Sequence, residues 1–218
     1  MAFTGGGSVQ VVLCRFTLLG PTGAPVVGPT NCYVFDGLIG VQLTPNYNKQ
    51  TTISQLDGQG RVCLTFSPPQ TFQYLQIDSF QLCQPNPEVL EFVNGGAVLQ
   101  DTGTGNAIGY AFPYIGSNPK PNGVGIEFWS LSVTGGSVNG YFHWLCPRAY
   151  MIFAKGLKLD GKDSSVVEIE GNGTENPNWL KGPKRDWNYT ISDRALMWVY
   201  EQALPNYTPG YSAVLAAS

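Results

Sequence analysis

One segment of this chain has a residue order typical of an α-helix, whereas most of the remaining sequence is typical of β-strands. Asn86 is a preferred N-cap residue, and Pro87 follows it at the first helical position, where its missing N–H is not needed. Acidic residues occupy the first turns, and Gly95 can adopt the left-handed conformation that ends a helix. We therefore expect one short helix over residues 87–94.

The expected helix carries a narrow apolar stripe. Val89, Leu90 and Val93 lie at helical spacing and would share one face. A helix this short is not stable by itself in water, so its apolar face must be buried. We expect these three side chains to pack the helix onto a sheet as a structural brace.

Several other segments are rich in β-branched and aliphatic residues and predict strands. The Asp57-Gly58-Gln59-Gly60 turn favours a hairpin between residues 53–56 and 61–66. In residues 166–170, carboxylates alternate with apolar side chains, which is typical of a half-exposed strand. Residues 194–200 fit either a helix or a strand, and the strand is favoured. The remaining predicted strands are 9–19, 32–43, 72–83, 124–133 and 141–154.

The composition also favours a mainly β protein. Gly 27 and Pro 16 make up about a fifth of the 218 residues, so turns are frequent and strands should be short. Neither an internal repeat nor a linker between two cores is visible. We expect a single domain over residues 1–218, a β-sandwich or barrel with one short flanking α-helix.

Charged side chains are scarce for a water-exposed protein. They form 12% of the chain, about half the usual share, and the first hundred residues hold only three basic and five acidic ones. A surface so poor in charge is expected to be covered by assembly. The net charge of -3 argues against a phosphate-binding surface, which needs clustered Lys and Arg, so direct binding of nucleic acid is not expected.

Cysteine usage and the chain start favour synthesis in a reducing cytoplasm. The five cysteines are an odd number with wide spacing, and none forms a C-x-x-C pair. The N-terminal residues lack the basic and apolar regions of a secretory signal. No apolar run is long enough to span a membrane as a helix.

The residues that could carry catalysis or bind a metal do not form a recognised pattern. His143 is the single histidine, and one His does not make a zinc site without suitably spaced partners. The glycines of residues 103–109 have the wrong spacing for a dinucleotide site, and residues 160–163 offer too few calcium ligands. Glu168 and Glu170 lie on one face of one strand, which is unsuited to glycoside hydrolysis. We expect no enzymatic activity, no cofactor and no metal.

The five tryptophans leave two interpretations open. They could line a sugar-binding face, as in a carbohydrate-binding module or a hydrolase. Their spread over the second half of the chain without a common spacing favours core and interface positions instead. They are Trp129, Trp144, Trp179, Trp187 and Trp198.

Four motifs together resemble a known family. The sequence over roughly residues 70–205 is similar to the major tail tube proteins of long-tailed, non-contractile bacteriophages, and most of all to those of actinobacterial phages. The resemblance rests on Asn-Pro-Glu-Val-Leu-Glu-Phe-Val-Asn-Gly-Gly at 86–96, Gly-Val-Gly-Ile-Glu-Phe-Trp-Ser at 123–130, Tyr-Phe-His-Trp-Leu-Cys-Pro-Arg at 141–148, and Asn-Pro-Asn-Trp at 176–179 with Gly182-Pro183.

This resemblance implies a tail-tube-type β-sandwich whose subunits form hexameric rings that stack into a tube. The tube would be part of the virion tail, and the phage genome would pass through it without specific binding. Implied partners are further copies of this chain, the tape measure protein, the tail terminator and distal tail proteins. Another virion β protein, such as a capsid-decorating, head-completion or tail-terminator protein, remains an alternative, as does a carbohydrate-binding module.

Two acidic residues are candidates for the wall of the channel. If the strands at 32–43 and 72–83 line a lumen, Asp36 and Asp78 are the ionised groups they carry. Carboxylates there would repel DNA phosphates. A turn or edge position is the alternative for each.

Two segments are candidates for contacts between subunits. Both are too rich in Gly, Asn and Pro to hold a fixed shape alone, and we expect them to become ordered against neighbouring subunits. The first is the flexible N-terminal arm at 1–8, and the second is the long turn-rich loop at 100–123. The candidate residues are Ala2, Phe3, Thr4, Asn106 and Tyr110.

Overall fold

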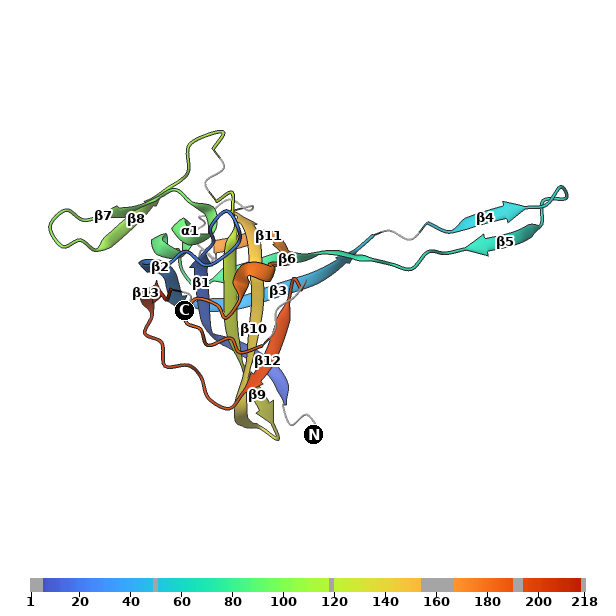
Figure 1. Ribbon diagram of the computed structural model, residues 1–218. Helices are drawn as coiled ribbons and strands as arrows, with labels where there is room; N and C mark the ends of the chain where they lie inside the picture. Colours follow the sequence, from blue (N-terminus) through green and yellow to red (C-terminus); the bar gives the residue numbers. More distant parts are fainter. Residues whose placement is uncertain (1–5, 49–50, 118–119, 154–166, 190–193, 217–218) are drawn as a thin grey trace, which may run out of the picture.

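The computed structural model describes residues 6–48, 51–117, 120–153, 167–189 and 194–216 (Figure 1). Over these residues the protein is mainly β, with a large antiparallel sheet, two separate hairpins and one short α-helix, which confirms the predicted fold class. The elements are β1 Gly7–Leu18, β2 Gly28–Phe35, β3 Leu38–Tyr47, β4 Ile53–Leu56, β5 Val62–Phe66, β6 Phe72–Leu82, α1 Pro87–Asn94, β7 Ala97–Gln100, β8 Ala107–Ala111, β9 Val124–Thr134, β10 Ser137–Ile152, β11 Val167–Thr174, the 3-10 helix η1 Pro177–Trp179, β12 Met197–Glu201 and β13 Gly210–Val214.

The large sheet folds back on itself. Its strand order is β13-β2-β1-β9-β10-β11-β6-β3, with β12 also paired to β10. Strands β2 and β3 therefore lie near opposite ends of the sheet, although only Asp36 and Gly37 separate them in the chain. Such a short connection is possible only if the two ends of the sheet approach each other. The result is a sandwich-like body with its core between the layers.

Strand β10 turns the corner between the layers. Its first half pairs with β12 over Tyr141–Leu145, and its second half pairs with β11 over Arg148–Ile152. Between the two halves lies a register shift from Cys146 to Ala149 against β9, and Pro147 sits inside it. Proline cannot donate a ladder hydrogen bond, so it is tolerated where the strand is irregular.

The main core is built from both layers and from the helix. Phe16 of β1 and Phe80 of β6 meet edge to face, with ring centroids 5.5 Å apart. The three predicted helix residues are buried in the same cluster: Val89 is 0%, Leu90 5% and Val93 1% exposed. The predicted packing of the helix is thus confirmed, and Phe92, buried beside them, was not predicted.

The helix has the predicted ends. The side chain of Asn86 accepts a hydrogen bond from the backbone N–H of Val89 at 2.9 Å, as an N-cap does. At the other end Gly95 has a φ of 75°, and its N–H donates to the carbonyl of Glu91 at 3.0 Å. Glycine adopts this left-handed φ without the steric cost of a Cβ.

The hairpin of β4 and β5, the half-exposed strand β11 and the strand β12 are also confirmed. Two predictions were wrong. Residues 32–43 are not one strand, because the chain leaves β2 at Phe35 and crosses to β3. Residues 100–123 are not loop throughout, because β8 lies within them and pairs with β7. Asp160-Gly161 also favours a hairpin between residues 156–159 and 166–169, and this turn lies outside the described residues.

Candidate functional site

An extended hairpin arm leaves the body of the molecule. Strands β3 and β6 pair out to Tyr47 and Phe72, whose rings meet edge to face at 5.8 Å. Beyond them, Asn48 and Thr71 are joined by two hydrogen bonds, and β4 and β5 then form the distal part of the arm (Figure 1). At the tip, the carboxylate of Asp57 accepts from the backbone and from the guanidinium of Arg61.

The distal arm has one apolar face. In the pairing of β4 with β5, Ile53 is opposite Phe66 and Leu56 is opposite Val62, while Ser54 and Thr65 form a pair pointing the other way. Alternation along β5 places its apolar residues on one side. We call this side the arm face, and every member of it is more than half exposed: Ile53 61%, Leu56 57%, Val62 59%, Leu64 56% and Phe66 55%.

A second hairpin, made of β7 and β8, projects beside the helix (Figure 1). Its surface also carries exposed apolar side chains, with Leu99 48% and Ile108 68% exposed. The candidate contact residues lie in this region. Asn106 is exposed at the turn, and its carbonyl accepts from Asp101. Tyr110 is half-buried, and its hydroxyl donates to the carbonyl of Gly95, so part of its surface serves to fix the hairpin to the helix end.

The other sequence-predicted residues lie apart from one another. Asp36 is exposed in the turn between β2 and β3, which is one of the two positions considered for it. Asp78 lies half-exposed on β6, where the hydroxyl of Thr44 donates to its carboxylate. The structure does not bring these two carboxylates together in any described contact. The candidates Ala2, Phe3 and Thr4 lie outside the described residues.

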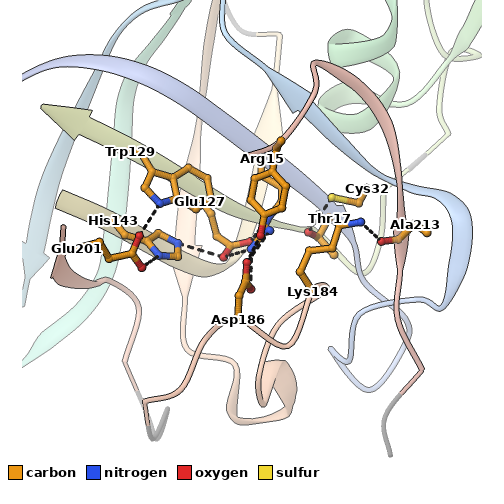
Figure 2. Close-up of polar contacts among 11 residues, drawn as sticks. Arg15, Thr17, Cys32, Glu127, Trp129, His143, Lys184, Asp186, Glu201 and Ala213 are labelled. Carbon is orange, nitrogen blue, oxygen red and sulfur yellow. Dashed lines mark hydrogen bonds and ion pairs between the residues drawn. The ribbon is translucent and has the colours of Figure 1, made fainter. Parts of the chain in front are cut away.

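A buried ionic network forms the polar centre of the body (Figure 2). Arg15 of β1 is fully buried and donates two hydrogen bonds to Glu127 of β9, at 2.7 and 2.6 Å. The same guanidinium donates to both carboxylate oxygens of Asp186, at 3.0 and 3.1 Å. It also lies over the rings of Trp129 and Tyr207, 5.3 and 4.9 Å from their centroids. One cation thus joins two strands of the sheet to two C-terminal segments.

His143 extends this network across the sheet. Its Nε2 lies 3.1 Å from the carboxylate of Glu127, and its Nδ1 lies 2.9 Å from that of Glu201. The indole of Trp129 donates to Glu201 at 3.1 Å and stacks on the imidazole, with centroids 4.2 Å apart. Both ring nitrogens of the histidine therefore face carboxylates.

Burial and ion pairing shift the pKa values of these groups in opposite directions. Burial alone would lower the pKa of His143, but the hydrogen bonds to Glu127 and Glu201 raise it above its ordinary value. Burial would raise the pKa of Glu127, but Arg15 and His143 hold it below its usual range. The pKa of Asp186 is lowered in the same way, chiefly by Arg15 against the effect of burial. Arg15, Glu127 and Asp186 are thus charged at neutral pH, and the two carboxylates favour the protonated form of His143.

The geometry of this network favours a structural role. The groups of the network are hydrogen-bonded to one another. The body holds three carboxylates, a guanidinium and an imidazole at close range. Its effect is to fix strands and C-terminal segments in one register, as buried networks do when every member is satisfied.

Sequence reasoning predicted a structural His143 between aromatic residues, and the structure confirms its place in β10. It missed Glu127 and Glu201 as its partners, and it missed Arg15 and Asp186 in the rest of the network. A signal existed for one of them: Arg15 is the single charged residue in the mainly apolar run from Val9 to Leu19, and a buried cation requires a carboxylate. The sequence offered no means to choose which carboxylate.

The described part of the chain contains no group of three or more His, Cys, Asp and Glu side chains placed to hold a metal ion. Within the same residues, no helix has the length and hydropathy to cross a membrane. A comparison of the chain with models of known protein families finds no match, and a comparison with curated proteins finds none either.

Proposed function

We propose that this protein is a structural subunit that assembles with copies of itself, and that the assembly is the tail tube of a bacteriophage. In this proposal six subunits form a ring, rings stack into a tube, and the genome passes through the lumen. The observation that carries the proposal is the arm face: five large apolar side chains on one side of a projecting hairpin, each more than half exposed.

An isolated two-stranded hairpin is at best marginally stable in water, and an exposed apolar face on it is typical of an interaction site. The distal arm has no described partner strand from the body, since β4 and β5 pair only with each other among the described strands. A second copy of the chain can cover the arm face. A contact between two different surfaces of identical subunits produces closed rings or open stacks, and both are needed for a tube.

The second hairpin supports the same proposal. Beyond β8, Phe112 is 56% exposed, and Tyr114 and Ile115 are 91% and 106% exposed. Together with the arm face, they give the molecule two separate apolar projections. A subunit that contacts neighbours on more than one side needs at least two such surfaces.

The charge of the chain suits a channel for DNA. A net charge of -3 and few basic residues give the phosphates little to bind, so the genome would not adhere. We propose Asp78, half-exposed on β6, as a wall residue, while Asp36 would contribute only if its turn faces the lumen. The tape measure protein, the tail terminator and distal tail proteins would be partners in the virion.

The proposal is tested by adding charge to the arm face. Leu64→Asp/Phe66→Asp places two carboxylates on exposed positions, so the body should fold normally. Ser54→Asp/Thr65→Asp is the matched control, because it adds the same charge to the opposite face of the same hairpin. We expect concentrated wild-type protein and the control to form long tubes in negative-stain electron micrographs, and the arm-face variant to remain monomeric in size-exclusion chromatography.

Three other outcomes would contradict the proposal. Discrete particles in place of tubes would favour a capsid-decorating, head-completion or tail-terminator protein. Saturable saccharide binding by a monomer that never assembles would favour a carbohydrate-binding module. Equal tube formation by the arm-face variant and the control would remove the arm face from the assembly contacts.

A further inference from the structure

A cavity of about 760 Å³ lies beside the body, outside the surfaces discussed above. Its walls come from the loop before β2, from residues 177–189 and from Leu215 near the C-terminal end. The loop before β2 is held in place by Asn176, a buried side chain that donates to the carbonyls of Gly23 and Pro147 at 2.7 and 3.0 Å. The volume is within the range of cavities that hold small organic molecules.

Two buried indoles border this cavity, but their N–H groups are closed off from it. Trp179 and Trp187 both line it and are 0% and 1% exposed. The Nε1 of each is buried without a hydrogen-bond partner among the described residues. A Cβ added at Gly182, another lining residue, would lie 3.0 Å from the Nε1 of Trp179, so the glycine packs closely against this indole. Buried indole N–H groups normally have an acceptor.

The charged groups of the cavity are cations. Lys181 and Arg185 line it, and neither forms a described ion pair with a carboxylate. The nearest acid in sequence, Asp186, is directed to Arg15 on the other side of the segment. Lys184, from the same segment, is not part of the lining and donates to the carbonyl of Ala213.

The segment that carries these cations has an unusual backbone. Among the described non-glycine residues, only three have a positive φ, and two of them, Leu180 at 53° and Arg185 at 58°, lie in the cavity wall. Strained residues of this kind are held by their surroundings and are concentrated at ligand-binding sites. Here they place Arg185 at the cavity while its neighbour Asp186 joins the buried network.

From the two lining cations and the apolar walls, we infer that this cavity binds a small organic carboxylate with an aromatic or aliphatic body. The ammonium of Lys181 and the guanidinium of Arg185 can only donate hydrogen bonds, so the ligand must supply acceptors. A guanidinium fits the two oxygens of a carboxylate in a fork geometry. The apolar walls, which include Val27 and Leu215, require a body that benefits from burial.

The test uses 3-phenylpropionate as the probe, with 3-phenylpropylamine as its cationic match and inorganic phosphate as an anion without an apolar body. Binding to dilute full-length protein is measured by calorimetry and by the indole N–H signals in ¹H–¹⁵N spectra. We expect saturable binding of the carboxylate with a Kd of about 1 mM or lower. Two of the five indole signals should shift, those of Trp179 and Trp187, and neither the amine nor phosphate should move them.

Matched variants locate the binding site. Lys181→Gln/Arg185→Gln should weaken carboxylate binding about tenfold or more, whereas Lys184→Gln should leave it unchanged, because this lysine is outside the lining. All three side chains are on the surface, so the variants should fold, and the dispersion of the spectra checks this. Absence of saturable binding, equal binding of the amine, or equal affinity in the double variant and Lys184→Gln would each overturn the inference. Tube formation is measured separately, so its failure would leave this result unaffected.

Discussion

At the scale of single residues, Arg15 determines most about this protein. It is 0% exposed, yet it carries a full charge, and it is compatible with the interior only because Glu127 and Asp186 surround its guanidinium. Burial alone would lower the pKa of Arg15, but the two carboxylates raise it above its ordinary value. A buried ion pair adds little stability relative to an apolar pair, but loss of one member leaves the other uncompensated.

Arg15→Met should therefore lower the free energy of unfolding by about 3–5 kcal/mol, since Glu127 would remain charged and buried. Urea unfolding followed by circular dichroism measures the loss. Arg61→Met is the control. The ion pair of Arg61 with Asp57 is at the surface, with the Arg61 side chain 74% exposed, so the loss of unfolding free energy should be under about 1 kcal/mol. Adding Glu127→Gln to Arg15→Met should restore part of the stability. Equal losses in the two single variants would contradict the role given to the network.

His143 should make stability depend on pH in a defined direction. Its pKa is raised on folding, so its protonation stabilises the protein fully below the unfolded pKa of about 6.5, and this contribution is lost as pH rises through the folded pKa. His143→Gln should consequently cost more stability at about pH 5.5 than at about pH 9. Urea unfolding of both proteins at both pH values checks the sign. A larger cost at the higher pH would mean that the histidine is neutral in the folded protein.

At the scale of elements, helix α1 and the hairpin arm differ in whether their apolar side chains are buried within the subunit. Helix α1 satisfies its own ends and buries its apolar face in the main core. The hairpin of β4 and β5 satisfies its inner backbone groups but leaves its apolar side chains exposed. The helix is therefore complete within one subunit, and the arm is not.

Leu90→Asp should destabilise the folded subunit by at least about 3 kcal/mol, because it places an uncompensated carboxylate among apolar side chains. Glu88→Gln, on the more exposed side of the same helix, should change stability by less than about 0.5 kcal/mol. Thermal unfolding compares the two. A variant Leu90→Asp with wild-type stability would show that the helix packs less tightly than its 5% exposure indicates.

At the scale of the whole molecule, long-range pairing dominates. Strands distant in sequence are neighbours, as when β1 pairs with β9 and β6 with β11, so the body forms only when the complete chain has collapsed. Buried cysteines are distributed over this body, whereas of the exposed ones Cys63 lies on the arm and Cys83 between β6 and α1. Their reactivity reports on the integrity of the fold.

Maleimide should label two of the five thiols in the native protein, those of Cys63 and Cys83, which are exposed. Burial raises the pKa of Cys32 to about 11 and of Cys146 to about 12, and it raises that of Cys14 as well, so these three are neither accessible nor ionised. Intact mass after brief labelling gives the count, and labelling in denaturant should give five adducts. More than two adducts in the native state would indicate local opening of the core.

The sequence alone determined the local structures whose signals are contained within a few residues. Asn86, Pro87 and Gly95 set both ends of the helix, because capping acts between neighbours. Asp57 and the glycines after it set the turn of the arm for the same reason. The alternation in β11 correctly predicted that Val167 and Ile169 face the core.

Only the tertiary structure decided which distant residues meet. The partners of Arg15 and His143 lie up to 171 residues away in sequence, and no periodicity encodes such a pairing. The break between β2 and β3 at Asp36-Gly37 was missed because apolar residues lie on both sides of it, although the two strands belong to opposite ends of the sheet. The cavity with Trp179 and Trp187 depends on three segments packing together. Local patterns select an element and its buried face, whereas packing between elements, which sums many weak contacts over the whole chain, selects the neighbours.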